Sequence, residues 1–334
     1  MKTNKNMTIG DIAEALGVSK STVSRAISGK GRIGEGTTAR ILAYIEEHDY
    51  HPNVIAQSLA GFKTSNICIA LPIDNNLTEL SYFHRISMGI CNYLSTENYD
   101  GLLATYTSSD IQNLQRIIMN QKVDGVIITR MFQDGLAVKY LKEQGIPFIA
   151  LGMDKDKKMI QLDANHRQAC KDLTYHLLRK GITKLALLGG DSTHIVSKER
   201  YHGFMEAHDK AGVSPHMELC YENVNNTART EACVDDLMQK GAECIICMDD
   251  NICTRVIRKL DRDRIEIPKQ IKVASFFGNS FLQNNIPPIT CLEYNVEEFG
   301  MLAAKLMLKV IDKEQVSPYT TINYRLNLRE STEG

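Results

Sequence analysis

Apolar residues near the start of the chain recur every three or four positions, which is the spacing of one face of an α-helix. They predict three short helices, at about residues 8–16, 19–28 and 37–48. Thr8 and Asp11 have capping-box-like spacing, Gly17 breaks the first helix, and Ser19 is placed to cap the second. The apolar residues expected to face inward are Ile9, Ile12, Ala13, Leu16, Val23, Ile27, Ile41, Leu42 and Ile45.

From Ile67 onward, short continuous apolar runs alternate with amphipathic helical stretches. Such an alternation is typical of parallel sheets covered by helices on both faces, in which ligands bind beyond the carboxyl ends of the strands. The expected strands are NICIALP, GLLATY, GVIIT, PFIAL, KLALLGG, ECIICM and KVASFF. The expected helices lie near residues 83–93, 111–120, 168–179, 199–211, 231–240, 253–260 and 296–311.

Length and charge separate a small basic part from the rest of the chain. With 334 residues, the chain is too long for one typical core and is expected to form two or three domains. Its net charge is −1, whereas residues 1–34 hold six Lys or Arg against two acidic residues. A local basic module fits neutralisation of nucleic-acid phosphates. Charge alone does not separate this interpretation from an ordinary solvated surface.

The cysteines and the first residues indicate a cytoplasmic protein. The segment MKTNKNMTIGDIAEAL lacks the apolar stretch of a signal peptide, and no apolar run approaches the length that crosses a bilayer. The nine cysteines form no disulfide framework. Cys244 and Cys247 have CxxC spacing but lie in a run that reads as a buried strand, so we expect structural cysteines. No metal site and no cofactor is expected.

The stretch from Thr8 to Gly29 carries the most specific motif of the sequence. Its turn, its caps and its polar second helix predict a helix-turn-helix, whose second helix enters the major groove of DNA. Arg25 is suited to a bidentate contact with guanine. The alternative is a surface helix in a generic three-helix bundle. The candidate DNA contacts of this unit are Thr8, Ser19, Lys20, Ser21, Thr22, Ser24 and Arg25, of which Ser19 and Thr22 are placed for phosphate.

The helix-turn-helix resembles the DNA-binding domain of the LacI/GalR family, and the likeness continues through GTTARILAYIEEHDYHPNVIAQSLAG. The resemblance implies a homodimer or larger assembly on a near-palindromic operator, with a hinge that folds into a short helix on the DNA. Leu59 would be the apolar wedge in the minor groove, and Gln57 stands where the family commonly has Arg. Gly34 replaces the usual Ser cap of the third helix. The hinge candidates for DNA contact are Asn53, Ala56, Gln57, Ser58 and Leu59.

The resemblance also implies the architecture of the remaining chain, a two-lobed domain similar to periplasmic sugar-binding proteins. The expected fold class is therefore a small all-α helix-turn-helix domain followed by a two-lobed α/β periplasmic-binding-protein-like domain with parallel sheets. The expected parts are the helix-turn-helix domain (1–51), the hinge and linker (52–64), and the effector-binding and dimerisation domain (65–334). Its lobes would comprise about 65–162 with 293–320, and about 163–292 with 321–334.

Several positions match the family's effector-contact motifs. Arg200 opens an Arg-x-x-Gly-Phe signature and would be the polar anchor of the ligand. Tyr82 and Phe83 match an aromatic pair that stacks on the ligand, although core packing is the commoner role of either residue alone. The remaining matches are Asn165 at a lobe crossing and the Asp249-Asp250 pair after ECIICM, in which Asp249 departs from the usual Asn and Asp250 is a ligand contact or a helix cap.

The segment SFFGNS departs most from the family pattern. Phe277 takes the place of an aspartate that grips the ligand in many relatives. The ligand is therefore expected to stack on Phe277, with Asn279 as a polar partner. This arrangement resembles family members that respond to glucosides such as maltose.

These observations predict a DNA-binding transcriptional repressor whose operator affinity is controlled by a mono- or disaccharide, regulating a carbohydrate-utilisation operon. Some relatives also use a phosphorylated corepressor protein, so such a partner remains open. Two alternatives are a regulator that responds to a non-sugar metabolite and a stand-alone sugar-binding protein. An enzyme is not expected, because KLALLGGD lacks the spacing of a dinucleotide or phosphate loop and no catalytic triad or paired carboxylates can be assigned.

Overall fold

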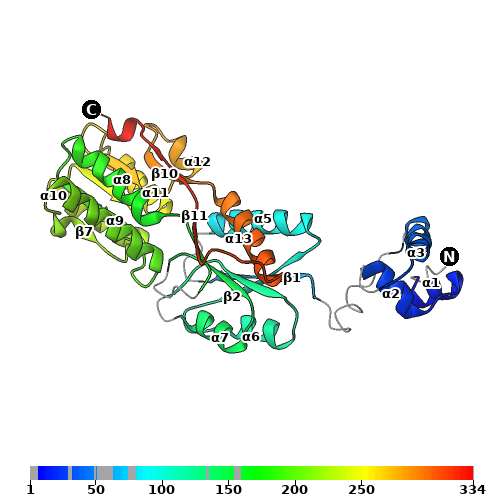
Figure 1. The fold of residues 1–334 in the computed structure, drawn as a ribbon. Coiled ribbons are helices and arrows are strands. Elements are labelled where there is room, and N and C mark those ends of the chain that lie inside the picture. The colour runs from blue at the N-terminus through cyan, green and yellow to red at the C-terminus, as the bar shows by residue number, and fades with distance from the viewer. Residues whose placement is uncertain are drawn as a thin grey trace. The chain divides into compact units, whose positions relative to one another are not determined.

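The chain forms two compact units, residues 1–64 and residues 65–334, coloured from blue to red along the chain in Figure 1. The computed structural model describes residues 7–28, 32–48, 50, 63–73, 80–132, 135–153 and 159–333. The five hinge candidates, Asn53, Ala56, Gln57, Ser58 and Leu59, lie outside the described residues. The two units are therefore considered separately below.

The first unit consists of the helices α1 (Ile9–Leu16), α2 (Lys20–Ser28) and α3 (Glu35–Glu47). A complete capping box starts α1: the backbone N–H of Thr8 donates to Asp11 Oδ2 at 2.7 Å, and the N–H of Asp11 donates to Thr8 Oγ1 at 3.3 Å. Gly17 ends α1 in the left-handed region at φ 66°, where glycine is favoured. No side chain caps α3 at Gly34.

A small hydrophobic core holds these three helices together. Each helix contributes one fully buried residue, namely Ile12, Val23 and Ile41. Leu42 was expected to face inward, but this prediction is wrong, since 47% of the residue is exposed. Leu42 follows Ile41 by one residue, so its side chain points about 100° away from that of Ile41, which is fully buried in the core.

The second unit contains two six-stranded sheets, each forming one lobe. Nearly all of its strand pairs are parallel; the antiparallel exception pairs β10 with β12. The first sheet has the order β11 (Tyr319–Thr321), β5 (Gln161–Asp163), β4 (Phe148–Leu151), β3 (Gly125–Ile128), β1 (Asn66–Pro72), β2 (Asp100–Tyr106). The second has the order β12 (Tyr324–Asn327), β10 (Thr290–Tyr294), β9 (Lys272–Ser275), β8 (Cys244–Cys247), β6 (Leu185–Leu188), β7 (Cys220–Tyr221).

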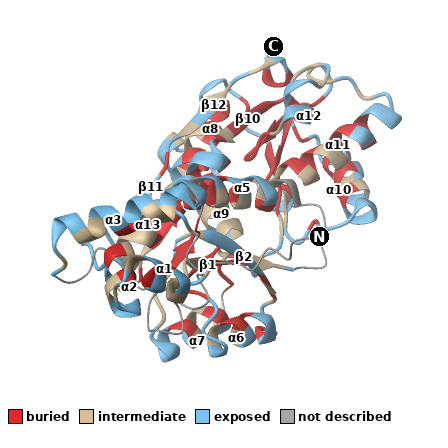
Figure 2. Cartoon of the chain, turned by 90° about the vertical axis from the view of Figure 1, so that its right-hand side faces the viewer, coloured by how far each residue is buried: buried red, intermediate tan, exposed pale blue. Residues whose placement is uncertain are grey.

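Helices cover both sheets, and Figure 2 shows that buried residues concentrate on the strands and on the inner faces of these helices. The periodicity predicted most of the helices, but not α7 or the short α12. The helices of the first lobe are α5 (Leu80–Thr96), α6 (Gln112–Met119), α7 (Leu136–Gln144) and α13 (Val296–Ile311). Those of the second lobe are α8 (His166–Arg179), α9 (Ile195–Ala211), α10 (Thr227–Gln239), α11 (Asp250–Arg262) and α12 (Ser280–Gln283).

The chain passes between the lobes in three places. It crosses from β5 to α8 after Asp163, from β10 to α13 after Tyr294, and from β11 to β12 after Thr321. The sequence placed these crossings near residues 162, 292 and 320. Because the three crossings lie at one side of both sheets, the strands of the two lobes end against a common space.

Close helix packing fixes the second lobe. A Cβ atom at Gly203 of α9 would lie 2.2 Å from the backbone oxygen of Arg167 in α8, so no larger residue fits without moving the backbone. The first lobe has the same arrangement at Gly89 of α5, where a Cβ atom would lie 2.2 Å from the oxygen of Glu297 at the start of α13. These glycines permit helix backbones to touch.

Replacing Gly203 by Ala is expected to destabilise the second lobe, because the added methyl group forces α9 away from α8. Overpacking of this kind costs about 1–3 kcal/mol. Chemical denaturation of G203A followed by circular dichroism measures the loss. Lys198→Ala, at an exposed position of the same helix, is the matched control and should change the free energy of unfolding by less than about 0.5 kcal/mol. Equal stabilities of G203A and K198A would contradict the close contact.

Candidate functional site

The polar face of α2 is the candidate DNA-contacting surface. Val23 and Ala26 of this helix are buried, whereas Lys20, Ser21 and Arg25 are exposed. Ser24 and Thr22 are half-buried. The hydroxyl of Thr8 caps the start of α1, and the hydroxyl of Ser19 caps the start of α2. The surface therefore presents two cations and a row of hydroxyl groups opposite the core.

Ser19 organises the start of α2. Its Oγ accepts a hydrogen bond from the backbone N–H of Thr22 at 3.1 Å, as expected for a cap. The same hydroxyl lies 2.7 Å from Ser21 Oγ and 2.8 Å from Thr22 Oγ1. Three hydroxyl groups thus cluster where the helix N-terminus directs its N–H groups outward, a place suited to phosphate oxygens.

A cavity lies between the two lobes of the second unit, where strand ends of both sheets meet. About 840 Å³ of space between atoms lies here, its opening to solvent included. Its apolar wall includes Tyr82, Leu151, Phe277 and Phe299. Its charged groups and its one imidazole are Arg130, Asp163, His166, Glu199, Arg200, Asp249 and Asp250.

Arg200 projects from the second turn of α9. The sequence placed it at the start of a helix near residue 199, but α9 begins at Ile195. Its Nη1 donates to the backbone oxygen of Met248 at 2.6 Å, and its Nε is buried without a hydrogen-bond partner among the described residues. One part of the guanidinium is thus fixed, while another remains available to a ligand.

The two aspartates after β8 have different tasks. Asp249 is the N-cap of α11: its Oδ1 accepts from the backbone N–H of Ile252 at 2.7 Å. Asp250 was considered a possible cap, but it is the first helical residue, and its Oδ2 accepts from Asn279 Nδ2 at 2.7 Å. Asn279 also caps α12 through Leu282 N–H and is not among the residues that line the cavity. Asn279 therefore acts on the cavity by positioning Asp250.

The aromatic wall centres on Phe277. One face of its ring stacks on Tyr294, with centroids 5.7 Å apart, and the edge contact with Tyr82 spans 5.5 Å. Phe83, the second residue of the predicted aromatic pair, is buried beside Tyr82 and does not line the cavity. The guanidinium of Arg130 lies 4.9 Å from the Phe83 ring centroid. Phe83 therefore supports the wall from behind.

Among the lining residues with charged or imidazole side chains, four were missing from the sequence prediction, namely Arg130, Asp163, His166 and Glu199. Asn165, which was predicted at this crossing, has a left-handed backbone at φ 56°, and its N–H donates to Asp163 Oδ2 at 2.8 Å. Its neighbours Asp163 and His166 line the cavity instead. The polar residues around a lobe crossing were the available signal, because a crossing necessarily borders the cleft.

Burial changes the protonation of these groups. Desolvation raises the pKa of Asp163 to about 6, and the negative charge of Glu199 adds to the rise. Desolvation and the charge of Asp249 raise the pKa of Asp250, also to about 6. Burial, aided by Arg200, lowers the pKa of His166 well below its usual value. At neutral pH the imidazole is therefore uncharged.

Comparison with known proteins finds a family model for a segment of each unit. Residues 8–53 match the model of bacterial regulatory proteins of the lacI family, and residues 174–332 match that of a periplasmic binding protein-like domain. The first unit thus carries a lacI-family segment, and the second carries a binding-protein-like segment. The HTH-type transcriptional regulator RegA of Clostridium saccharobutylicum is 26% identical over 332 residues, covering 97% of this chain and 98% of RegA.

Solved structures support the fold. A Lac repressor dimer bound to operator and the anti-inducer ONPF matches with a TM-score of 0.80 and 20% identity, covering 99% of this chain and 100% of that chain. A complex of the transcriptional regulator CelR with cellobiose matches with a TM-score of 0.73 and 22% identity, over 97% and 99% of the respective chains. The predicted fold class is confirmed.

Two further sequence predictions bear on other kinds of site. Cys244 and Cys247 lie in the buried strand β8 and are free cysteines, as expected. Across the described ranges, no cluster of three or more His, Cys, Asp or Glu side chains is arranged to hold a metal ion. Within the same ranges, no helix combines the length and the apolar character needed to span a membrane.

Asp250→Asn is expected to stabilise the protein at pH 7.5, because ionised Asp250 is costly in its buried position. A carboxyl pKa raised from 3.8 to about 6 destabilises the folded state by up to about 3 kcal/mol above pH 6, and this penalty disappears below pH 4. The stability difference between D250N and the unmodified protein should therefore shrink as pH falls from 7 to 4. Urea denaturation at several pH values measures it. Asp261→Asn, exposed on the same helix, should show no such trend; a flat difference curve for D250N would refute the assignment.

Proposed function

We propose that the protein is a sequence-specific DNA-binding repressor whose affinity for a near-palindromic operator is controlled by a mono- or disaccharide in the cavity between its lobes, and that it regulates carbohydrate utilisation. One observation carries the proposal: a single chain joins a helix-turn-helix to a cavity with an aromatic wall and an arginine. The Nε of this arginine is buried and has no hydrogen-bond partner in the part of the chain that the structure describes. The relatives RegA and MalR are HTH-type transcriptional regulators.

The composition of the cavity favours a sugar over an apolar metabolite. A pyranose ring has an apolar face, which suits the rings of Tyr82 and Phe277, and a rim of hydroxyl groups, which suits Arg200 and the carboxylates. CelR, a relative in fold, is known in complex with cellobiose. Binding of such a ligand between two lobes favours their closed arrangement, and this differential affinity is the means by which an effector changes operator binding.

The DNA-contacting residues are proposed on the geometry of α2. Arg25, Lys20, Ser21 and Ser24 would face base edges, while Ser19 and Thr22 would contact phosphates. Operator recognition of a near-palindrome requires two copies, so we propose a homodimer, in keeping with the Lac repressor dimer on its operator. A phosphorylated corepressor protein stays a prediction that no described contact tests.

Arg200→Ala is expected to abolish the response of the protein to its effector while leaving DNA binding intact. The unmodified protein should gain thermal stability with at least one sugar of a mono- and disaccharide panel that includes cellobiose and maltose, because a ligand of the folded state raises apparent stability. The same sugar should change operator affinity in a fluorescence-anisotropy titration. Arg258→Ala, an exposed position on α11, is the control and should respond normally. If no sugar alters either stability or operator affinity, a sugar effector is ruled out.

Arg25 can be tested by paired substitutions. Arg25→Ala should lower the affinity for the operator more than for random DNA of equal length, by about 10-fold or more, because a bidentate arginine–guanine contact contributes about 1–3 kcal/mol of discrimination. Arg25→Lys keeps the charge but loses the planar fork. R25K should therefore lose specificity as R25A does, while keeping the salt dependence of the unmodified protein. Full specificity in R25K would show that residue 25 contacts only phosphate.

A further inference from the structure

Two carboxylates of the cavity come from opposite lobes. Asp163 ends β5 in the sheet of the first lobe, and Glu199 lies on α9 in the second lobe. Both line the same cavity. Asp163 is only 5% exposed, and the Glu199 side chain is 17% exposed. Opening or closing of the lobes therefore changes the separation of two largely buried negative charges.

Asp163 is held in place by the backbone of the crossing. Its Oδ2 accepts from the N–H of Asn165 at 2.8 Å, and the N–H groups of Ala164 and His166 also favour its ionised form. The charge of Glu199 acts against that form and raises the pKa of Asp163. Because both carboxylates line one cavity, their negative charges act on each other through a medium of low dielectric constant.

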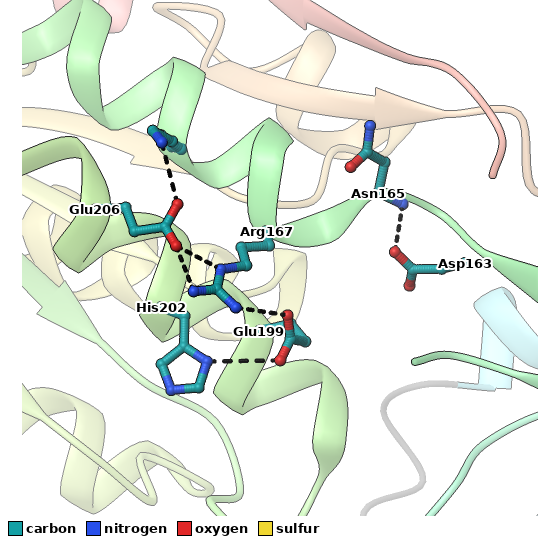
Figure 3. Close-up of polar contacts among 7 residues, drawn as sticks. Asp163, Asn165, Arg167, Glu199, His202 and Glu206 are labelled. Carbon is teal, nitrogen blue, oxygen red and sulfur yellow. Dashed lines mark hydrogen bonds and ion pairs between the residues drawn. The ribbon is translucent and has the colours of Figure 1, made fainter. Parts of the chain in front are cut away.

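Glu199 is only weakly compensated from its own lobe (Figure 3). Its Oε1 lies 3.5 Å from His202 Nδ1, and its Oε2 lies 3.9 Å from Arg167 Nη1. Arg167 instead hydrogen-bonds to Glu206 through Nε at 2.7 Å and through Nη2. Glu199 Oε2 is buried and has no hydrogen-bond partner among the described residues. This oxygen, on a residue that lines the cavity, can therefore accept further hydrogen bonds.

His166 gives an independent indication of a ligand. It follows the same crossing, lines the cavity and is only 7% exposed. Its Nδ1 is buried without a hydrogen-bond partner among the described residues. Since buried polar atoms in folded proteins are rarely left unpaired, such an atom at a cavity indicates a group that the ligand supplies.

The charges of the whole cavity set the class of that ligand. Four carboxylates, Asp163, Glu199, Asp249 and Asp250, face two guanidinium groups, Arg130 and Arg200. Over the described lining residues, the charges therefore sum to a net negative value. A phosphate or carboxylate group on the ligand would be repelled, whereas hydroxyl or ammonium groups would donate to the acceptors already present.

We propose that Asp163 and Glu199 form an inter-lobe acceptor pair that binds hydrogen-bond donors of an uncharged or cationic sugar and excludes sugar phosphates and sugar acids. In the empty protein the pair opposes closure, because closing brings the two charges together. Ligand hydroxyl or ammonium groups placed between the two carboxylates would instead donate a hydrogen bond to each of them. The inference rests on the proposed function, since it assigns the chemical class of the effector in that same cavity.

The ligand arm of the test uses a series of full-chain titrations by calorimetry. The probes are the tightest-binding neutral sugar of the panel, glucose, glucosamine, glucose 6-phosphate and glucuronate. Neutral sugars or glucosamine should bind at least about tenfold more tightly than the two anions, a factor corresponding to one charge-assisted hydrogen bond. E199Q and D163N should each reduce this ratio of affinities, because each lowers the affinity for the neutral or cationic probe and raises the affinity for the two anions. Glu222→Gln, exposed on the same lobe, should leave it unchanged. Preferential binding of an anionic probe would overturn the inference while leaving a sugar-controlled repressor intact.

The ligand-free arm uses a double-mutant cycle of D163N, E199Q and the double variant, with melting temperatures measured at pH 7.5 and low salt. Repulsion between the two groups predicts that each substitution alone raises the melting temperature more than it does when the other is already present. Additive shifts would overturn the pair even if both variants fold well. Coupled shifts without binding of any sugar would retain the pair and reject the sugar effector, so the two proposals fail separately.

Discussion

The backbone contact of α9 with α8 is the constraint on which the cavity depends. Gly203 brings the two helices together without an intervening side chain. Arg200 and Glu199 precede Gly203 by three and four residues, and residues at these spacings share one side of a helix. The contact that anchors α9 therefore also fixes the direction of both side chains. A helix free to shift by an ångström would not hold Arg200 on the oxygen of Met248.

Three charged side chains of the cavity each make a hydrogen bond within the protein. One oxygen of Asp249 accepts the hydrogen bond that caps α11, and Asp250 accepts one from Asn279. Arg200 donates from Nη1 to a backbone carbonyl. Each group is thereby fixed in orientation before a ligand arrives. Fixed dipoles and charges need little reorganisation on binding, which is the physical basis of specificity in polar sites. The remaining accepting and donating capacity, at Glu199 Oε2, Arg200 Nε and His166 Nδ1, is what a ligand meets.

The sequence predicted the elements whose pattern is local and missed those that depend on neighbours. The runs GVII and CIIC, now β3 and β8, are buried on both faces and were recognised as strands. The short segments QLD and YTT, now β5 and β11, have no apolar pattern of their own; they are strands because they pair with each other in the first sheet. Similarly, α9 begins at Ile195 without a side-chain cap, so its start carried no signal.

The same distinction applies to the site. Arg200, Asp249, Asp250, Phe277 and Tyr82 stand in motifs, and the structure places them all on the cavity. Asp163 and Glu199 belong to different lobes, and no sequence motif links them; the fold places both on the same cavity.

The aromatic ring of Phe277 makes other hydrogen-bond acceptors of the cavity, such as Asp163 and Glu199, important for a sugar ligand. The resemblance places Phe277 where many relatives have an aspartate that holds the ligand. Its ring stacks on Tyr294 and meets Tyr82 at an edge, so it adds surface to the cavity but accepts no hydrogen bond. A sugar ring against this wall still needs acceptors for its hydroxyl groups, because an unpaired polar group that leaves water costs about 1–3 kcal/mol. The carboxylates of Asp250, Asp163 and Glu199 line the same cavity and can accept such hydrogen bonds. Under the proposed function, the exchange of an aspartate for an aromatic ring at one position would leave hydroxyl recognition to residues on both lobes.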